Sequence, residues 1–251
     1  MLEQAQYRIL RRISPQEPRG LSGDVYKGRI KVKVLLGDAL FDELREKVVI
    51  DLGCGEGDDA VALAKNGALR VMGIDIRESL LERARLKARR RGVEEICHFC
   101  TYTDEKADAI VSIDAFEHFS DPASILLTMA SLLKPRGSLY ASFGPIWYHP
   151  LGGHLFSVFP WAHLLFSEKA LIRWRSDIRS DGATRFGEVE GGLNQMTIAR
   201  FEKLVKRSPF VVDSLEAVPI RRLRLLHNRF TREFTTSIVR CKLTLAHPNP
   251  A

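Results

Sequence analysis

The segment that most constrains the fold of this chain is 48–57, which reads Val-Val-Ile-Asp-Leu-Gly-Cys-Gly-Glu-Gly. Its short apolar run predicts a buried strand at 48–52, of the kind found in parallel sheets. A glycine-rich turn between such a strand and a helix lets the backbone approach a ligand closely, while helix N–H groups point at that ligand. The segment therefore predicts an α/β domain with a ligand site beyond the carboxyl end of this strand.

The rest of the chain alternates between strand and helix patterns, as an α/β domain requires. We expect strands at 48–52, 70–75, 96–101, 109–114, 138–143, 210–218 and 235–244. We expect helices at 58–66, 78–91, 122–133 and 197–206. This alternation indicates a mostly parallel sheet covered by helices on both faces.

Length and composition are those of an ordinary globular protein. The chain has 251 residues, of which 45% are hydrophobic and 27% are charged, enough to bury a core without disulfides. No apolar run approaches the length of a membrane span, and no apolar stretch of an export signal follows the first charged residues. With four cysteines and no such signal, we expect a cytoplasmic location. We divide the chain into an N-terminal helical or lid segment, 1–46, and a main domain, 47–251.

The net charge of +7 raises the possibility of nucleic-acid binding. Basic residues gather in three runs, at 8–33, 83–91 and 221–232. The middle run is typical of a solvated helix, because acidic residues stand near its start and Arg89, Arg90 and Arg91 precede Gly92 at its end. The last run has no such explanation and leaves an RNA-binding function open.

Two carboxylates, and the absence of the last glycine of a dinucleotide-binding motif, restrict the class of ligand that the loop can bind. Asp51 precedes the glycines within the first strand, and Asp75 ends the second, where a carboxylate can bind both hydroxyls of a ribose. Asp58 occupies the position of the last glycine in a dinucleotide-binding motif. Two further motifs follow, Asp114-Ala115-Phe116-Glu117-His118-Phe119-Ser120-Asp121-Pro122 and Leu132-Leu133-Lys134-Pro135-Arg136-Gly137.

From 48 to 143 these motifs resemble the class I S-adenosylmethionine-dependent methyltransferases, in particular the small-molecule group related to ubiquinone-biosynthesis methyltransferases. The resemblance implies a Rossmann-like methyltransferase fold, a doubly wound seven-stranded mostly parallel sheet whose last strand is antiparallel. It also implies S-adenosyl-L-methionine as cofactor, with S-adenosyl-L-homocysteine as product. The residues that the resemblance assigns to the cofactor are Asp51, Gly53, Cys54, Gly55, Gly57, Asp75, Ile76, Asp114, Ala115 and Phe116.

Within this set the resemblance assigns separate roles. The 53–57 loop passes the methionine and ribose, Asp75 binds the ribose hydroxyls, Ile76 packs on the adenine, and 114–116 line the cleft near the sulfonium. The sequence departs from the family after the third strand, where 101–106 leave room for no more than a single helical turn. Asp104, or the backbone near Tyr102, is therefore the candidate adenine contact.

Methyl transfer from a sulfonium is an in-line displacement that can require a base, and histidine has a suitable pKa. His118 follows the fourth strand, and His149, His154 and His163 follow the fifth. We favour His154 as the base, because the two glycines before it let the backbone present its ring. His149 and His118 are the other candidates, and a structural role stays open for each.

An aromatic insertion follows the fifth strand, and we expect 144–194 to be a substrate lid. Eight of the 32 residues in 143–174 are aromatic, and 147–166 contains no lysine or arginine. This composition favours a pocket for a small, apolar or aromatic acceptor. Plain core packing is one alternative, and a membrane-surface lid flanked by Arg173 and Arg175 is another.

Two clusters resemble metal sites, but we predict no bound metal. Asp114, Glu117 and His118 form a set that holds a divalent ion in some ubiquinone-type relatives and occurs without metal across the wider family. Cys97 and Cys100 have an odd separation in a strand, so their side chains should point to opposite faces. We interpret them as buried strand cysteines and not as a zinc site.

The function predicted from the sequence is methyl transfer to a small, apolar or aromatic metabolite on oxygen, nitrogen or carbon. An RNA methyltransferase is the first alternative, although 114–117 differ from the Asn/Asp-Pro-Pro-aromatic motif that grips a flipped base, and nucleic acid is not the expected partner. A non-catalytic cofactor-binding protein is the second alternative, and the intact glycine loop with Asp75 argues against it.

Overall fold

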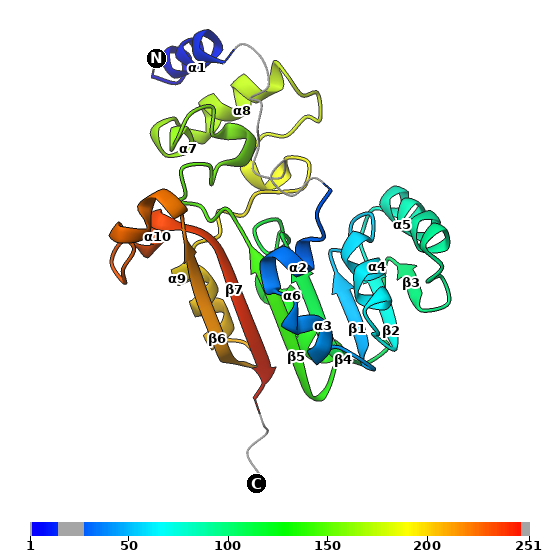
Figure 1. The fold of residues 1–251 in the computed structure, drawn as a ribbon. Coiled ribbons are helices and arrows are strands. Elements are labelled where there is room, and N and C mark those ends of the chain that lie inside the picture. The colour runs from blue at the N-terminus through cyan, green and yellow to red at the C-terminus, as the bar shows by residue number, and fades with distance from the viewer. Residues whose placement is uncertain (1, 15–27, 247–251) are drawn as a thin grey trace.

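Seven strands form one sheet in the computed structural model, which describes residues 2–14 and 28–246 (Figure 1). The strands are β1 (Val48–Leu52), β2 (Arg70–Ile74), β3 (Cys97–Cys100), β4 (Ala107–Ile113), β5 (Leu133–Phe143), β6 (Phe210–Pro219) and β7 (Thr236–Leu245). Their order is β3-β2-β1-β4-β5-β7-β6. The pairings from β3 to β5 are parallel, and β7 is antiparallel to both β5 and β6. The predicted mostly parallel sheet with an antiparallel last strand is confirmed.

The strand order reverses between β1 and β4. From β1 the chain proceeds outward through β2 to β3, then returns to β4 on the other side of β1. At such a reversal the connections that leave the two strands diverge, and a crevice opens beyond their carboxyl ends. The 53–57 loop follows β1 and residues 114–121 follow β4, so the fold places both segments at this crevice.

Helices cover both faces of the sheet (Figure 1). One face packs on α2 (Lys31–Leu36), α3 (Ala39–Glu43), α4 (Asp58–Lys65) and α5 (Glu78–Arg91), and the other on α6 (Pro122–Leu132) and α9 (Ile198–Lys206). The Asp121 carboxylate caps α6 by accepting the N–H groups of Ala123 and Ser124, each at 3.1 Å, and Pro122 fills the first turn. Among the described residues, no helix combines the length and apolar character that crossing a membrane requires.

Two strands begin earlier than predicted, whereas the other strand boundaries agree within one residue. β4 and β5 begin at Ala107 and Leu133, because these two residues pair with each other ahead of a register shift. The Lys134-Pro135-Arg136-Gly137 stretch, which follows the predicted helix 122–133, therefore lies within β5. Residues 101–106 contain no helix, in agreement with the prediction of at most one turn.

The insertion after β5 has its own hydrophobic core. It contains α7 (Ala162–Leu165), α8 (Glu168–Ser176) and 3₁₀ turns at His154–Phe156 and Phe186–Glu188. Phe156, Trp174 and Phe186 pack together there with Leu10 of α1 (Leu2–Ile13). The Trp174 indole also donates to the Ser14 carbonyl at 2.7 Å. Helix α1 therefore belongs with the insertion, above the sheet (Figure 1).

The predicted N-terminal segment 1–46 is divided between two places. Helices α2 and α3 pack on the sheet, whereas α1 packs on α8. Residues 1 and 15–27 of that segment, and residues 247–251, lie outside the described residues. The boundary at residue 46 stays a prediction.

Candidate active site

The glycine loop after β1 is held against its neighbours on one side and open on the other. All three of its glycines have positive φ, with 86° at Gly53, 52° at Gly55 and 75° at Gly57. The Gly53 N–H donates to the Ile74 carbonyl at 2.8 Å, and a Cβ added at Gly53 would lie 3.1 Å from the Cβ of Ala115. A Cβ added at Gly55 would meet no atom within 4 Å. A ligand can therefore approach the backbone of this loop at Gly55.

Asp75 joins the end of β2 to the glycine loop. Its Oδ2 accepts the Gly55 N–H at 3.0 Å, and its Oδ1 accepts the Arg77 backbone N–H at 3.0 Å and Nε at 3.1 Å. Burial opposes ionisation of this carboxyl, but the hydrogen bonds from Arg77 hold the pKa of Asp75 below its ordinary value. Asp75 is therefore a charged acceptor at the position that the sequence assigned to a ribose.

The predicted adenine side lies beyond β2 and β3, which are parallel neighbours. Ile76 is 90% exposed next to Asp75. Asp104 is exposed in the connection that follows β3, and Tyr102 there is 75% exposed. Because both strands end at the same edge of the sheet, Ile76, Tyr102 and Asp104 all come after the strands at that edge. Their contact with adenine stays a prediction.

Two of the predicted cofactor residues lie behind the loop and not at its open side. Asp51 is 3% exposed, and its Oδ2 has no hydrogen-bond partner among the described residues. Burial raises the pKa of Asp51 well above its ordinary value. The Cys54 side chain is buried against Gly73. Both side chains therefore lie in the protein interior and not at the open side of the loop.

At the end of β4 the structure differs from the prediction for the Phe116 side chain and shows an additional residue, Lys31, paired with Asp114. The Phe116 side chain, expected along the cleft, is fully buried and contacts Phe143 and Phe201, with ring centroids 5.7 and 5.2 Å away. Its apolar ring packs in the sheet core, so only its backbone can face a ligand. Asp114 has a φ of 50°, and its Oδ2 accepts from Lys31 Nζ at 2.6 Å. No sequence pattern predicts this pair, whose members lie 83 residues apart.

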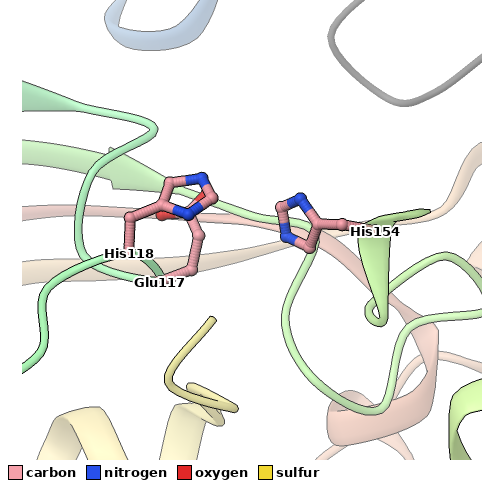
Figure 2. A group of neighbouring side chains, drawn as sticks. All are labelled: Glu117, His118 and His154. Carbon is pink, nitrogen blue, oxygen red and sulfur yellow. The ribbon is translucent and has the colours of Figure 1, made fainter. Parts of the chain in front are cut away.

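Glu117, His118 and His154 meet in space although His154 comes from the insertion (Figure 2). One potential ligand atom from each residue lies within 4.8 Å of the others. The His118 and His154 rings are 5.2 Å apart between centroids and tilted by 68°. His118 Nδ1 lies 2.8 Å from the Gly192 carbonyl oxygen, which can only accept. The hydrogen bond therefore places the proton on Nδ1 and leaves a lone pair on Nε2.

Burial changes the protonation of the other two members. Glu117 is 2% exposed, with Oε1 accepting the Gly144 N–H at 3.1 Å and Oε2 lacking a partner among the described residues. Burial, reinforced by the Asp114 carboxylate, raises the pKa of Glu117 to about 8. Burial also lowers the pKa of His154 to about 3, so this imidazole is neutral and weakly basic. On this geometry His118 is a better candidate base than the favoured His154.

The remaining two histidines hold the insertion together. His149 Nδ1 accepts the Leu151 N–H at 2.9 Å, and burial lowers the pKa of His149 to about 4. His163 is buried, with Nδ1 3.0 Å from Ser157 Oγ and Nε2 2.7 Å from the Trp147 carbonyl oxygen. Both ring nitrogens of His163 are therefore occupied, as the structural alternative requires.

The insertion is fastened to the loop after β4 by Asn194. Its Nδ2 donates to the Phe116 carbonyl at 2.6 Å and to the Phe119 carbonyl at 2.8 Å. Its own N–H donates to the Glu117 carbonyl at 3.0 Å. The sequence around Asn194 does not predict this role, because no local pattern indicates a contact across more than seventy residues.

The aromatic side chains of the insertion are used differently from the pocket that the sequence predicts. Phe156 and Trp174 are fully buried in the core of the insertion. Trp147 contacts the His163 ring edge-on, with centroids 4.7 Å apart. Trp161 Nε1 donates to the Tyr148 carbonyl at 2.9 Å. The core-packing alternative therefore describes Phe156 and Trp174, since these apolar rings are what gives the insertion an interior.

Of the two motifs that the sequence presents as possible metal sites, the first contributes to a cluster of possible ligands among the described residues and the second does not. Glu117, His118 and His154 offer a carboxylate and two imidazoles, a donor set that suits a divalent transition ion, whereas Asp114 pairs with Lys31. Cys97 is buried and Cys100 half-buried, on opposite faces of β3 as predicted, and both thiols are free.

Comparison with known proteins places the methyltransferase motifs in a described family. Residues 44–144 match the family model of a methyltransferase domain. The ubiquinone biosynthesis O-methyltransferase of Neisseria meningitidis serogroup C is 38% identical over 107 residues, which are 40% of this chain and 45% of that protein. The chain thus aligns with less than half the length of this curated relative.

Solved structures share the fold at lower identity. An S-adenosylmethionine-dependent methyltransferase from Mesorhizobium loti superposes with a TM-score of 0.59 at 18% identity, covering 87% of this chain and 99% of that one. Magnesium protoporphyrin IX methyltransferase from Synechocystis PCC 6803, solved with bound S-adenosylhomocysteine, gives 0.56 at 18% identity over 98% and 96% of the two chains. The family match begins just before β1 and ends just after β5, so the part of the chain that forms the first five strands is similar to a methyltransferase domain, and the solved methyltransferases share its fold.

Proposed function

We propose that this chain transfers a methyl group from S-adenosylmethionine to oxygen, nitrogen or carbon of a small, apolar or aromatic acceptor. The observation that carries the proposal is the hydrogen bond between the Gly55 N–H and Asp75. It joins the glycine loop to the carboxylate that we assign to the ribose. The contact of Gly53 with Ala115 adds the end of β4 to the same site. The curated O-methyltransferase relatives support the same reaction class.

The residues present fit this cofactor. The loop has open space at Gly55, where a backbone can approach a ligand, and Asp75 is buried, charged and able to accept two hydroxyls. We assign Asp75 to the ribose, Ile76 and Asp104 to the adenine, and Asp114 with Ala115 to the methionine end. Arg77 occupies Asp75 in this structure, so its side chain would turn outward when a ribose takes its place.

The cofactor, when bound, supplies a methyl group on a sulfonium, which a nucleophile displaces in line. We assign His118 Nε2 to accept the proton of the acceptor, since Gly192 fixes the opposite ring nitrogen as the protonated one. Methylation of a protonated acceptor atom releases a proton, which His118 Nε2 would hold. The neutral His154 ring lies beside the His118 ring, with centroids 5.2 Å apart.

The proposed acceptor lies between the loop after β4 and the 144–194 insertion. The His154 ring of the insertion contacts the His118 ring, and Asn194 fastens the two segments, so an acceptor that reaches His118 would lie at the edge of this contact. The absence of lysine and arginine from 147–166 favours an acceptor without phosphates. This composition is also why we prefer a metabolite to RNA.

The test is transfer of labelled methyl from the cofactor to metabolite pools, followed by kinetics on the acceptor found. We expect His118→Ala to lower turnover by about 10²–10⁴-fold at unchanged cofactor affinity. His98→Ala, at an exposed histidine of β3, is the matched control and should behave as the parent. Cofactor binding without transfer to any acceptor would favour the non-catalytic alternative.

A metal control belongs to the same experiment. Because the proposal gives His118 to proton transfer, activity should survive prior treatment with EDTA. Activity that is lost with EDTA and restored by a divalent ion would instead assign Glu117, His118 and His154 to metal binding.

A further inference from the structure

The connection between β6 and β7 exposes large apolar side chains. It contains a 3₁₀ helix at Arg221–Leu226 and α10 (Arg232–Thr235). The exposed fractions are 101% for Leu225, 61% for Leu226, 80% for Phe230 and 46% for Phe234. Single exposed apolar residues are ordinary, but a group of four within ten residues indicates a surface that meets something apolar. We call these four residues, together with the exposed Arg221, Arg222, Arg224 and Arg229, the β6–β7 patch; Arg232, which pairs with Glu202 at 2.6 Å, is not part of it.

The arginines of this patch are exposed and lack acidic partners. In the described part of the chain, no carboxylate pairs with Arg221, Arg222, Arg224 or Arg229. Arg229 instead lies over the Phe230 ring, 4.6 Å from its centroid. In contrast, Arg83 and Arg85 of α5 pair with Glu56 and Glu78 at 2.9 and 2.6 Å. The positive charge of the β6–β7 patch is therefore free for an anionic partner.

The patch lies at the same edge of the sheet as the candidate active site. β6 and β5 are both antiparallel to β7, so their carboxyl ends share an edge, and the patch lies below the insertion (Figure 1). The Phe234 ring contacts Tyr148 of the insertion, with centroids 5.0 Å apart. Beyond Tyr148, α7 exposes Leu164 by 37% and Leu165 by 66%. The β6–β7 connection therefore contacts the insertion at Tyr148, and the insertion carries two further exposed leucines on α7.

We propose that the β6–β7 patch docks on the surface of an anionic lipid bilayer. Leucine and phenylalanine can enter the boundary between headgroups and acyl chains, while arginines beside them remain at the level of lipid phosphates. The fully exposed Leu225 favours acyl chains over RNA, because an isolated leucine offers no stacking surface to a base. An acceptor dissolved in the bilayer would then enter the protein from the docked side. The docking itself does not depend on the proposed methyl transfer.

The experiment is co-flotation of the full chain with vesicles. One set is neutral phosphatidylcholine, and the other contains roughly 30% phosphatidylglycerol, near the anionic fraction at which basic clusters bind. We expect at least about tenfold stronger binding to the anionic set, weakened by salt. Leu225→Ser with Phe230→Ser, and separately Arg221→Ala with Arg222→Ala and Arg224→Ala, should each reduce that binding about tenfold or more.

The matched control replaces three other exposed arginines, Arg89, Arg90 and Arg91, with alanine at the end of α5. It removes the same charge and should change vesicle binding by less than about twofold, because these side chains lie on a different element. Circular dichroism of each variant should match the parent, since the altered side chains are exposed.

Three outcomes would overturn the proposal. The first is equal binding to both vesicle sets or none. The second is an equal loss in the α5 control, which would indicate general charge attraction. The third is no vesicle binding together with a patch-dependent dimer or a patch-dependent complex with a short RNA, which would give the surface to one of those partners.

Discussion

At the residue scale, Asp75 is the side chain on which the site most depends. One of its oxygens holds the glycine loop through Gly55, and the other is held by Arg77. The sequence predicted Asp75 from its place at the end of a strand. It did not predict Arg77 as its partner, because an arginine two residues away can as easily extend into solvent.

Asp75 and Arg77 should respond in opposite ways to substitution. Asp75→Ala removes two proposed charge-assisted hydrogen bonds to the ribose, each contributing about 1.5–3 kcal/mol, so the cofactor Kd should rise about 100-fold or more. Arg77→Ala should bind no more weakly than the parent, since it only frees the Asp75 oxygens. Calorimetric titration with S-adenosylhomocysteine measures both. Equal weakening by the two substitutions would show that Arg77 itself contacts the ligand.

At the scale of elements, the glycine loop shows which positions serve packing and which serve the ligand. A Cβ at Gly57 would lie 2.8 Å from Ala84 Cβ and from a ring carbon of Phe99, so Gly57 is required for helix and strand to approach. At Gly55 the same addition meets no protein atom within 4 Å. The sequence presents these two glycines alike, and only their surroundings separate them.

Gly55→Val should therefore abolish cofactor binding and leave the protein folded. The positive φ of 52° costs a valine about 1–2 kcal/mol, and its branches would fill the open side of the loop. Gly92→Val is the matched control, because Gly92 has a φ of 66° and equally open surroundings at the end of α5. Calorimetry and thermal unfolding should show similar loss of stability in both variants and loss of binding in one. Intact binding by Gly55→Val would contradict the role of the loop.

The insertion is the element that the sequence describes least well. Its aromatic content predicted a pocket, but composition does not say whether a ring faces a ligand or another ring. Phe156 and Trp174 are both buried in a hydrophobic core that includes Leu10 of α1. That core depends on a segment more than 140 residues away in the sequence, which no local pattern reveals.

At the scale of the whole molecule, the buried Glu117 carboxyl should make stability depend on pH. Its pKa of about 8 lies above the value of about 4.3 expected in the unfolded chain, so the folded state keeps a proton that the unfolded state releases. Its contribution is therefore fully present below about pH 4.3 and is lost as the pH rises towards 8. Glu117→Gln, which stays neutral, should gain stability relative to the parent between pH 5 and about 8.5.

Urea unfolding midpoints across that range measure this difference. Glu43→Gln is the control with the opposite sign: although burial opposes ionisation, hydrogen bonds from Lys242 and Tyr140 lower the pKa of Glu43. Its difference from the parent should stay constant above about pH 5, because Glu43 is ionised throughout. A pH-independent difference for Glu117→Gln as well would mean that Glu117 is ionised in the folded protein.

The sequence predicts the sheet well because its information there is local. Apolar runs, caps and glycines specify strands and helices, and the resemblance supplies their order. The candidate site is predicted only where it follows the same local pattern, at Asp75 and the 53–57 loop. The pairs Lys31–Asp114 and His118–His154 form between segments that are distant in the sequence, so no local sequence pattern predicts them.

The packing of α1 on α8 has a consequence for synthesis of the chain. The indole of Trp174 bonds to the carbonyl of Ser14 across 160 residues, so α1 leaves the ribosome long before its partner exists. At about 5–20 residues per second, the interval is roughly 10–30 s. A helix of 12 residues is only marginally stable alone in water, so α1 stays largely unfolded until α8 has been synthesised. The completed insertion is then a late product of translation, and a nascent chain arrested before α8 leaves Leu10 and Tyr7 accessible to chaperones.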